Sequence, residues 1–237
     1  MTTTPKPHRQ FLKALKDKSE RERIGEVTRF FRVSPSVDSS DNKFLGVRFG
    51  DIFALAKQFV EMPLSEIEVL LENPYYEVRM GAVSIMDFQA RAKRTPADHR
   101  TALFNLYMRR HDRINNWDLV DRAAVYVVGS YLSDKPRDVL YKLARSRNPW
   151  ERRTAIVSTY YFVRQGDVDD TFRIAELLVT DEHDLVQKAV GSWLREAGKK
   201  DQKRLLVFLK TYSTSMSRPM LRYAVEKLPP AIRAKYI

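Results

Sequence analysis

The sequence of 237 residues contains no cysteine and only four histidines. The absence of cysteine excludes disulfide frameworks, zinc ribbons, iron–sulfur clusters and thiol nucleophiles, and it is typical of proteins in a reducing compartment. The histidines, at positions 8, 99, 111 and 183, lack the spacing of metal ligands. We therefore expect a protein that binds no metal and needs no cofactor.

Long apolar runs and familiar catalytic signatures are also missing. The apolar run at 123–128 is far shorter than the ~20 residues that span a bilayer, and the N-terminus has no apolar core of signal-peptide length. The sequence contains no H-E-x-x-H or G-x-S-x-G motif, no Walker loop and no dinucleotide fingerprint. These absences predict a cytoplasmic protein without any of these common sites.

Acidic residues are the minority among the charged residues. The chain has 42 Lys and Arg against 30 Asp and Glu, which leaves a formal net charge of +12. Such a surplus favours a polyanionic partner. The basic residues recur along the whole chain beside expected helix ends, so they form a stripe if these ends align. Any one cluster is equally well explained as a solvated helix face, but the total charge is not.

Signals for β-strands are absent as well, since the sequence has no Asn-Gly or Asp-Gly pair and no sustained alternation of apolar and polar residues. From residue 50 onward, apolar residues recur at the three- and four-residue spacing of amphipathic helices. Prolines precede these runs, where a missing N–H costs nothing; they stand at 63, 74, 96, 136, 149 and 219. Before residue 50 we expect one or two basic amphipathic helices at about 9–31 and a polar loop at 33–43.

Five of the expected helices share a local phrase around a small residue. The alanines of this phrase stand at 82, 124, 155, 189 and 224, separated by 42, 31, 34 and 35 residues. This is the spacing of helix-pair repeats, in which a small residue lets two helices approach closely. The sequence therefore predicts an all-α solenoid in a single domain over 1–237, with N-terminal helices and a loop in 1–50 and stacked helix pairs in 50–237.

The stretch NNWDLVD at 115–121 is the most informative for function. Asn116 is a good N-cap, which places Asp118 in the first turn facing the positive end of the helix dipole. Asp121 follows Trp117 by four residues and lies within the apolar stripe of the same face. An unpaired carboxylate within an apolar stripe lowers the stability of the fold. Asp121 is therefore expected either to form a salt bridge to a neighbouring repeat or to belong to a functional site. The adjacent tryptophan favours a site.

One repeat later stands NPWERR at 148–153. Arg153 precedes its repeat alanine by two residues and Asp121 precedes its own by three. In a regular solenoid the two side chains would project from adjacent helices to nearly the same face. A tryptophan, an aspartate and an arginine can then share one concave cleft. Trp150, taken alone, is more typical of a packing residue.

Five phrases carry a resemblance to a known family: FLGVR at 44–48, NNWDLVD at 115–121, NPWERR at 148–153, KAVG at 188–191 and LRE at 194–196. In this order and spacing they resemble the HEAT-like alkylpurine DNA glycosylases, the AlkD family, from about residue 20 to the end. The resemblance implies a HEAT-like solenoid with a concave basic face that binds duplex DNA containing alkylated purines, as a monomer associated with the nucleoid. It also implies hydrolysis of the N-glycosidic bond of N3- or N7-alkylated purines.

By this resemblance, Asp121 matches the family's catalytic aspartate, Trp117 its cleft tryptophan and Arg153 its active-site arginine. An N3- or N7-alkylated purine is already cationic and departs readily, so no strong general acid is required. The carboxylate would stabilise the oxocarbenium-like sugar and orient water, while the indole offers a π face to the cation. Arg153 would hold a phosphate. Since no lysine occupies the cleft position, the enzyme is expected to be monofunctional.

Further residues are expected to contact DNA: Arg113, Trp150, Arg152, Lys188, Ser192 and Arg195. The chain departs from the family pattern at one of them. The second cleft tryptophan normally follows the glycine of the KAVG phrase, but here Ser192 stands there and the tryptophan is Trp193. One step along a helix rotates a side chain by ~100°, so we expect Trp193 to pack in the core. The loop at 33–43 also lacks the glycine- and glutamate-rich composition of many relatives.

Two other functions stay open. The first is a non-catalytic DNA-binding relative that recognises unusual DNA structures, which Ser192 favours and Asp121 disfavours. The second is a protein-binding scaffold, the common use of helical repeats, which the net charge and the Trp117/Asp121 pair disfavour.

Overall fold

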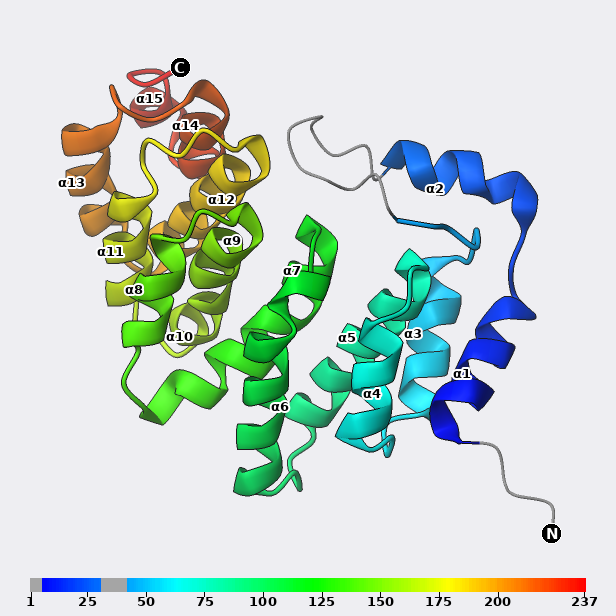
Figure 1. Cartoon of the computed structure of the whole chain (residues 1–237). Helices are drawn as coiled ribbons and strands as arrows, with labels where there is room; N and C mark the ends of the chain where they lie inside the picture. The colour runs from blue at the N-terminus through cyan, green and yellow to red at the C-terminus, as the bar shows by residue number, and fades with distance from the viewer. Residues whose placement is uncertain (1–5, 31–41) are drawn as a thin grey trace, which may run out of the picture. The chain divides into compact units, whose positions relative to one another are not determined.

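The computed structural model describes residues 6–30 and 42–237, and over these residues the chain is all-helical (Figure 1). The described residues form no β-strand, and an isolated bridge joins Lys43 to Tyr75. The all-α prediction is therefore confirmed for this part of the chain. The chain divides into two compact units, Met1–Ala123 and Ala124–Ile237, which are described separately below.

The first unit is built around one long buried helix, α5. Its helices and turns are α1 (Pro7–Lys16), η1 (Arg21–Arg23), α2 (Ile24–Phe30), α3 (Phe49–Gln58), α4 (Leu64–Leu71), α5 (Tyr76–Arg91), α6 (Ala97–Arg109), η2 (His111–Arg113) and α7 (Trp117–Ala123). Helices α3, α4 and α7 pack against α5, so nearly all residues of α5 are buried (Figure 1). The packing of α7 on α5 positions the phrase that carries Trp117 and Asp121.

The second unit is organised around α12. Its elements are the π-helix η3 (Ala124–Gly129), η4 (Tyr131–Asp134), α8 (Asp138–Ala144), α9 (Pro149–Ser158), α10 (Tyr160–Arg164), α11 (Asp169–Leu177), α12 (Asp184–Lys200), α13 (Gln202–Tyr212), α14 (Arg218–Val225) and α15 (Pro230–Arg233). Helix α12 packs against α14, α9 and α13. A Cβ built on Gly191 of α12 would overlap the carbonyl oxygen of Met220 in α14. Only glycine allows this close approach.

The predicted repeat alanines are all buried, and they lie in α5, η3, α9, α12 and α14. The prolines also stand where predicted: Pro63 and Pro96 are N-caps, and Pro149 and Pro219 lie in the first turn of their helices. Two helices occupy the N-terminal region expected to hold them: α1 is basic as predicted, whereas α2 carries one Glu and one Arg and is neutral. The solenoid arrangement of these helices stays a prediction.

One sequence-based expectation differs from the structure, and another falls mostly on residues that the structure does not describe. The spacing places the repeat alanine at 124 in a regular helix, but from this residue the chain widens into the π-helix η3. Gly129 at the end of η3 approaches α9 so closely that a Cβ would overlap the carbonyl oxygen of Ser158. The predicted loop at 33–43 falls for residues 33–41 outside the described residues, and its last residue, Lys43, is bridged to Tyr75.

Candidate functional site

The first turn of α7 begins at Asn116, as the sequence predicts. The Asn116 carbonyl accepts the first helical bond from the backbone N–H of Val120, at 3.2 Å. Its side-chain oxygen accepts from the N–H of Trp117 at 2.8 Å, instead of from the second or third N–H as in the usual cap. Asn116 is buried and also hydrogen-bonds the hydroxyl of Tyr76, which draws its side chain toward α5.

Trp117 and Asp121 stand on the same face of α7, because the helix is regular over the four residues that separate them. Both side chains are half-buried. The structure thus brings together the two residues that the sequence singled out in this unit. Arg153 belongs to the other unit, so the expected meeting of Asp121 and Arg153 stays a prediction.

Asp118 has a role that the sequence did not reveal. Only 8% of this residue is exposed, and its Oδ1 accepts hydrogen bonds from the hydroxyl of the fully buried Tyr76 and from the backbone N–H of Leu119 at 3.0 Å. Burial raises the pKa of Asp118 to about 7, and the charge of Asp121 adds to this rise. The capping interpretation missed Tyr76, because this partner lies 42 residues earlier in the chain.

Arg79 secures the segment that leads into α7. This buried arginine donates to the carbonyl of Asn73 at 2.8 Å, to that of Pro74 at 3.3 Å and to the side chain of Asn115 at 3.3 Å. Burial, and then the charge of Arg113, lowers the pKa of Arg79 to about 10. Sequence reasoning missed Arg79, although a charged residue inside the apolar repeat phrase at 78–83 was the available signal.

In the second unit, Arg153 and Trp150 are both buried in α9. Arg153 is 7% exposed and donates to the backbone carbonyl of Leu185, in the first turn of α12. Trp150 packs edge-on against His183, with ring centroids 5.3 Å apart. Burial lowers the pKa of His183, which favours the neutral ring beside the indole. The packing interpretation of Trp150 therefore agrees with the structure better than the expected DNA contact does.

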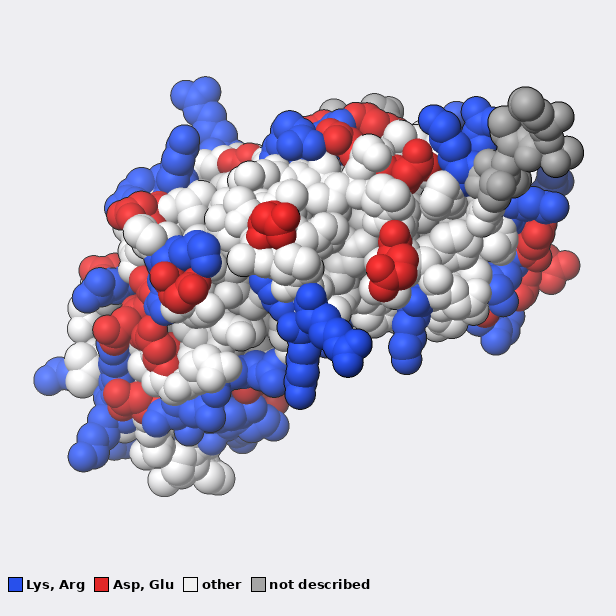
Figure 2. All heavy atoms as spheres, turned by 90° about the horizontal axis from the view of Figure 1, so that it is seen from below, with Lys and Arg blue, Asp and Glu red and all other residues white. Residues whose placement is uncertain are grey.

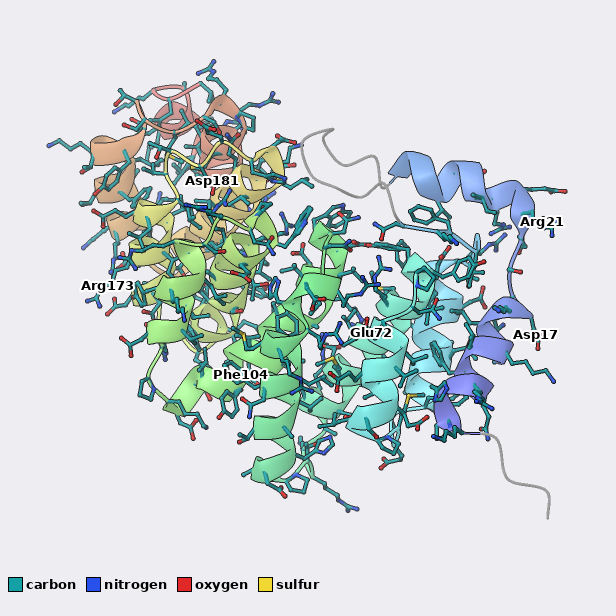
Figure 3. The ribbon with its side chains drawn as sticks, viewed as in Figure 1. Asp17, Arg21, Glu72, Phe104, Arg173 and Asp181 are labelled. Atoms are coloured by element: carbon teal, nitrogen blue, oxygen red, sulfur yellow. The ribbon has the colours of Figure 1, made fainter. Side chains whose placement is uncertain are left out.

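Two arginines expected to contact DNA are bonded within the chain. Arg152 forms a two-point ion pair with Asp181, at 2.6 and 3.1 Å, and Figure 3 labels this aspartate. Arg113, in the first unit, donates to the backbone carbonyls of Leu71 and Glu72 at 3.2 and 3.1 Å. These bonds occupy guanidinium donors that a phosphate would otherwise use.

The remaining residues that were predicted to contact DNA lie on α12. Lys188 pairs with Asp184 at 2.7 Å, and Arg195 pairs with Glu196 at 3.1 Å. Ser192 is half-buried. The neighbouring Trp193 stacks on Tyr160, with centroids 4.5 Å apart and rings inclined by 20°. Trp193 is itself half-buried, so it packs on Tyr160 rather than in the core where we expected it.

Lys188 also lines a basic groove that the sequence did not reveal. The groove is formed by residues of α12 and α14 together with the residue after α14 and has a volume of about 480 Å³; its lining residues are Lys188, Arg218, Pro219, Arg222, Tyr223 and Glu226. Tyr223 is 38% exposed, so an aromatic ring is available beside the cations. Lys and Arg side chains are also distributed over the face shown in Figure 2, with Asp and Glu side chains between them. The cations of this groove suit the phosphates of a nucleic acid, and an exposed aromatic ring can stack on a base.

The described residues contain no group of three or more His, Asp or Glu arranged to hold a metal ion. Within the same part of the chain, no helix combines the length and the apolar character needed to cross a membrane.

Comparison with known proteins gives the family. A model of the DNA alkylation repair enzymes matches residues 11–228. Among solved structures, the chain is similar to a predicted DNA alkylation repair enzyme from Enterococcus faecalis, with a TM-score of 0.69 and 18% identity, over 90% of this chain and 98% of that one. No curated protein matches the chain. Because the family model spans nearly the entire sequence, the chain belongs to the DNA alkylation repair enzyme family.

Proposed function

We propose that the protein is a monofunctional DNA glycosylase of the AlkD type, which hydrolyses the N-glycosidic bond of cationic N3- or N7-alkylated purines in duplex DNA. The observation that carries this proposal is the placement of Trp117 and Asp121 on one face of α7. An aromatic face next to a carboxylate suits a reaction in which positive charge passes from a purine to a sugar.

The chemistry requires little from the protein beyond electrostatics. The bond between C1′ and the purine nitrogen breaks, and its electron pair leaves with the base, which becomes neutral. Asp121 would stabilise the positive charge that develops on the sugar and orient a water molecule toward C1′. That water gives up a proton, through the Asp121 carboxylate to solvent, as the new C–O bond forms. Trp117 would stabilise the cationic base and sugar through its indole face.

Binding would rest on the basic surface. The net charge of +12 favours the DNA backbone, and the groove between α12 and α14 offers Lys188, Arg218 and Arg222 for phosphates. Arg153 would hold a phosphate through guanidinium donors other than the one that bonds the Leu185 carbonyl. Helix α7 contains no lysine, which supports hydrolysis without the strand cleavage that an amine nucleophile allows.

The decisive experiment is the release of free N7-methylguanine from a duplex that contains it. We expect Asp121→Asn to lower the excision rate by orders of magnitude and to leave DNA affinity unchanged or slightly higher, since it removes a negative charge. Asp112→Asn, which changes an exposed carboxylate in the same unit, is the matched control. Excision that survives in Asp121→Asn removes this carboxylate from the mechanism.

A second candidate is a DNA-binding protein of the same family that performs no chemistry. Ser192 and the stacking of Trp193 on Tyr160 favour it, because a second aromatic wall is then missing from α12. In that case the wild-type protein binds duplex DNA tightly and releases no base from any alkylated duplex.

A further inference from the structure

The buried pair formed by Tyr76 and Asp118 lies one helical turn before Asp121. Asp118 and Asp121 are three residues apart in α7, so their side chains are neighbours on the helix surface. The Tyr76 hydroxyl and the Leu119 N–H both donate to Oδ1 of Asp118. Oδ2 is buried and has no hydrogen-bond partner among the described residues.

The groups around the pair do not neutralise this oxygen. Asn116 hydrogen-bonds the Tyr76 hydroxyl on the other side. The charged groups that act on the pair from α5 and α7 are Arg79 and Asp121, and Glu77 acts in turn on Arg79. The Glu77 carboxylate accepts from the N–H groups of Leu45 and Gly46, while the Arg79 guanidinium donates to the carbonyls of Asn73 and Pro74 and to the side chain of Asn115. Arg79 thus acts on Asp118 only through its charge; no ion pair to Asp118 is formed within the part of the chain that the structure describes, and the nearest carboxylate on its own helix is Asp121.

We propose that Tyr76 and Asp118 form a positioning pair for Asp121, in which Asp118 holds a proton on Oδ2 below neutral pH and leaves Asp121 as the negative charge of the site. The role assigned to Asp121 rests on the proposed glycosylase function.

Asp118 would hold this proton because a second ionised carboxylate beside Asp121 is energetically unfavourable. A buried carboxylate oxygen without a donor is unfavourable, and a like charge one turn away adds to the cost. Protonation of Oδ2 removes the charge and leaves both hydrogen bonds to Oδ1 intact. The raised pKa of Asp118, about 7, agrees with this assignment.

Ionisation of Asp118 would disturb the site. The anionic Oδ2 needs a donor, so the first turn of α7 must open to admit water, and this movement displaces Trp117 and Asp121. If only the neutral form is competent, kcat falls by about tenfold between pH 6 and 8, because the protonated fraction of a group with a pKa near 7 changes by that factor. KM is expected to change little, since the DNA-binding cations are not involved.

The test combines a titration with kinetics. Carboxyl ¹³C NMR of aspartate-labelled protein measures each midpoint without reference to activity, and a signal lost in Asp118→Asn identifies Asp118. We expect its midpoint near neutrality, and a higher midpoint in Tyr76→Phe, because the tyrosine hydrogen bond lowers the pKa of Asp118. The kcat profile should be flat from pH 6 to 8 in Asp118→Asn and displaced to higher pH in Tyr76→Phe.

Tyr107→Phe is the matched control, because Tyr107 is an equally buried tyrosine on α6. It should leave both the midpoint and the kcat profile at their wild-type positions. If every aspartate of the wild type titrates below pH 5, the pair does not hold a proton and the proposal is wrong. A near-neutral midpoint together with an unchanged kcat profile in Asp118→Asn also overturns the positioning role. A protein that releases no base refutes the glycosylase function, while the NMR titration still decides where the proton resides.

Discussion

Arg122 in the last turn of α7 forms a 2.9 Å ion pair with the buried carboxylate of Asp87 in α5. The same guanidinium donates to the Ser84 hydroxyl at 3.0 Å and lies 4.7 Å from the centres of the Phe53 and Phe88 rings. Helix α7 is therefore fixed to the unit at both ends, by Asp118 at its start and by Arg122 at its end. The turn that carries Asp121 lies between these two attachments.

Loss of the ion pair between Arg122 and Asp87 should lower the free energy of unfolding. Asp87→Ala leaves the guanidinium of Arg122 without its buried counter-charge, and breaking a buried pair by removing one partner costs about 3 kcal/mol of unfolding free energy. Urea denaturation measures this loss. Arg91→Ala removes the second, more exposed partner of Asp87 and should cost about 0.5 kcal/mol. Equal losses in the two variants would contradict a structural role for the Arg122 pair.

Asp118 should also affect stability as the pH changes. Its pKa is about 7 in the folded chain and about 3.8 in the unfolded chain, so between these values the folded state binds more protons. Stability of the wild type relative to Asp118→Asn should then fall as the pH rises, by up to about 1.4 kcal/mol per pH unit, and level off above pH 7. Melting temperatures of both proteins from pH 4 to 8 measure this difference. A constant difference would show that Asp118 ionises normally.

Substitutions at Ser192 and Trp193, neighbours on α12, should affect different properties: excision rate at Ser192 and thermal stability at Trp193. Trp193→Ala removes the stack on Tyr160 and should mainly lower the melting temperature. Ser192→Trp would supply the second aromatic wall of the family pattern and should raise excision several-fold, since a cation–π contact contributes ~1 kcal/mol. Excision rates and melting curves of both variants separate these effects. An active Trp193→Ala together with a Ser192→Trp no faster than wild type would refute the missing-wall hypothesis.

If the groove between α12 and α14 binds DNA phosphates, its arginines should affect how DNA affinity depends on salt concentration. Arg222→Ala should reduce the magnitude of the slope of log K against log salt by about 0.9, the value for one lost phosphate contact on duplex DNA. Binding to undamaged and alkylated duplexes should weaken alike. Arg173→Ala, which removes the exposed charge labelled in Figure 3 from α11, controls for the change in net charge. If both variants have the wild-type slope, the groove does not hold a phosphate.

Short-range patterns in the sequence predicted much of the fold and part of the site. Proline positions and the repeat alanines depend on local helix geometry, so the helix starts and the buried faces followed from spacing alone. The shared face of Trp117 and Asp121 followed for the same reason. The partners of Asp118 and Arg152 did not, because Tyr76 and Asp181 lie 42 and 29 residues away and the contacts depend on how the helices pack.

Gly191 shows why one of the sequence motifs shared with the family, KAVG at 188–191, contains a glycine. The glycine is required because α12 lies directly against the Met220 carbonyl of α14, and this contact involves none of the proposed chemistry. A descendant that had lost the carboxylate of α7 would still need glycine at this position to fold. The KAVG phrase therefore reflects how two helices of the scaffold pack, and under the proposed function it is the aspartate at position 121 that would distinguish a repair enzyme from a chain that has kept the architecture and lost the reaction.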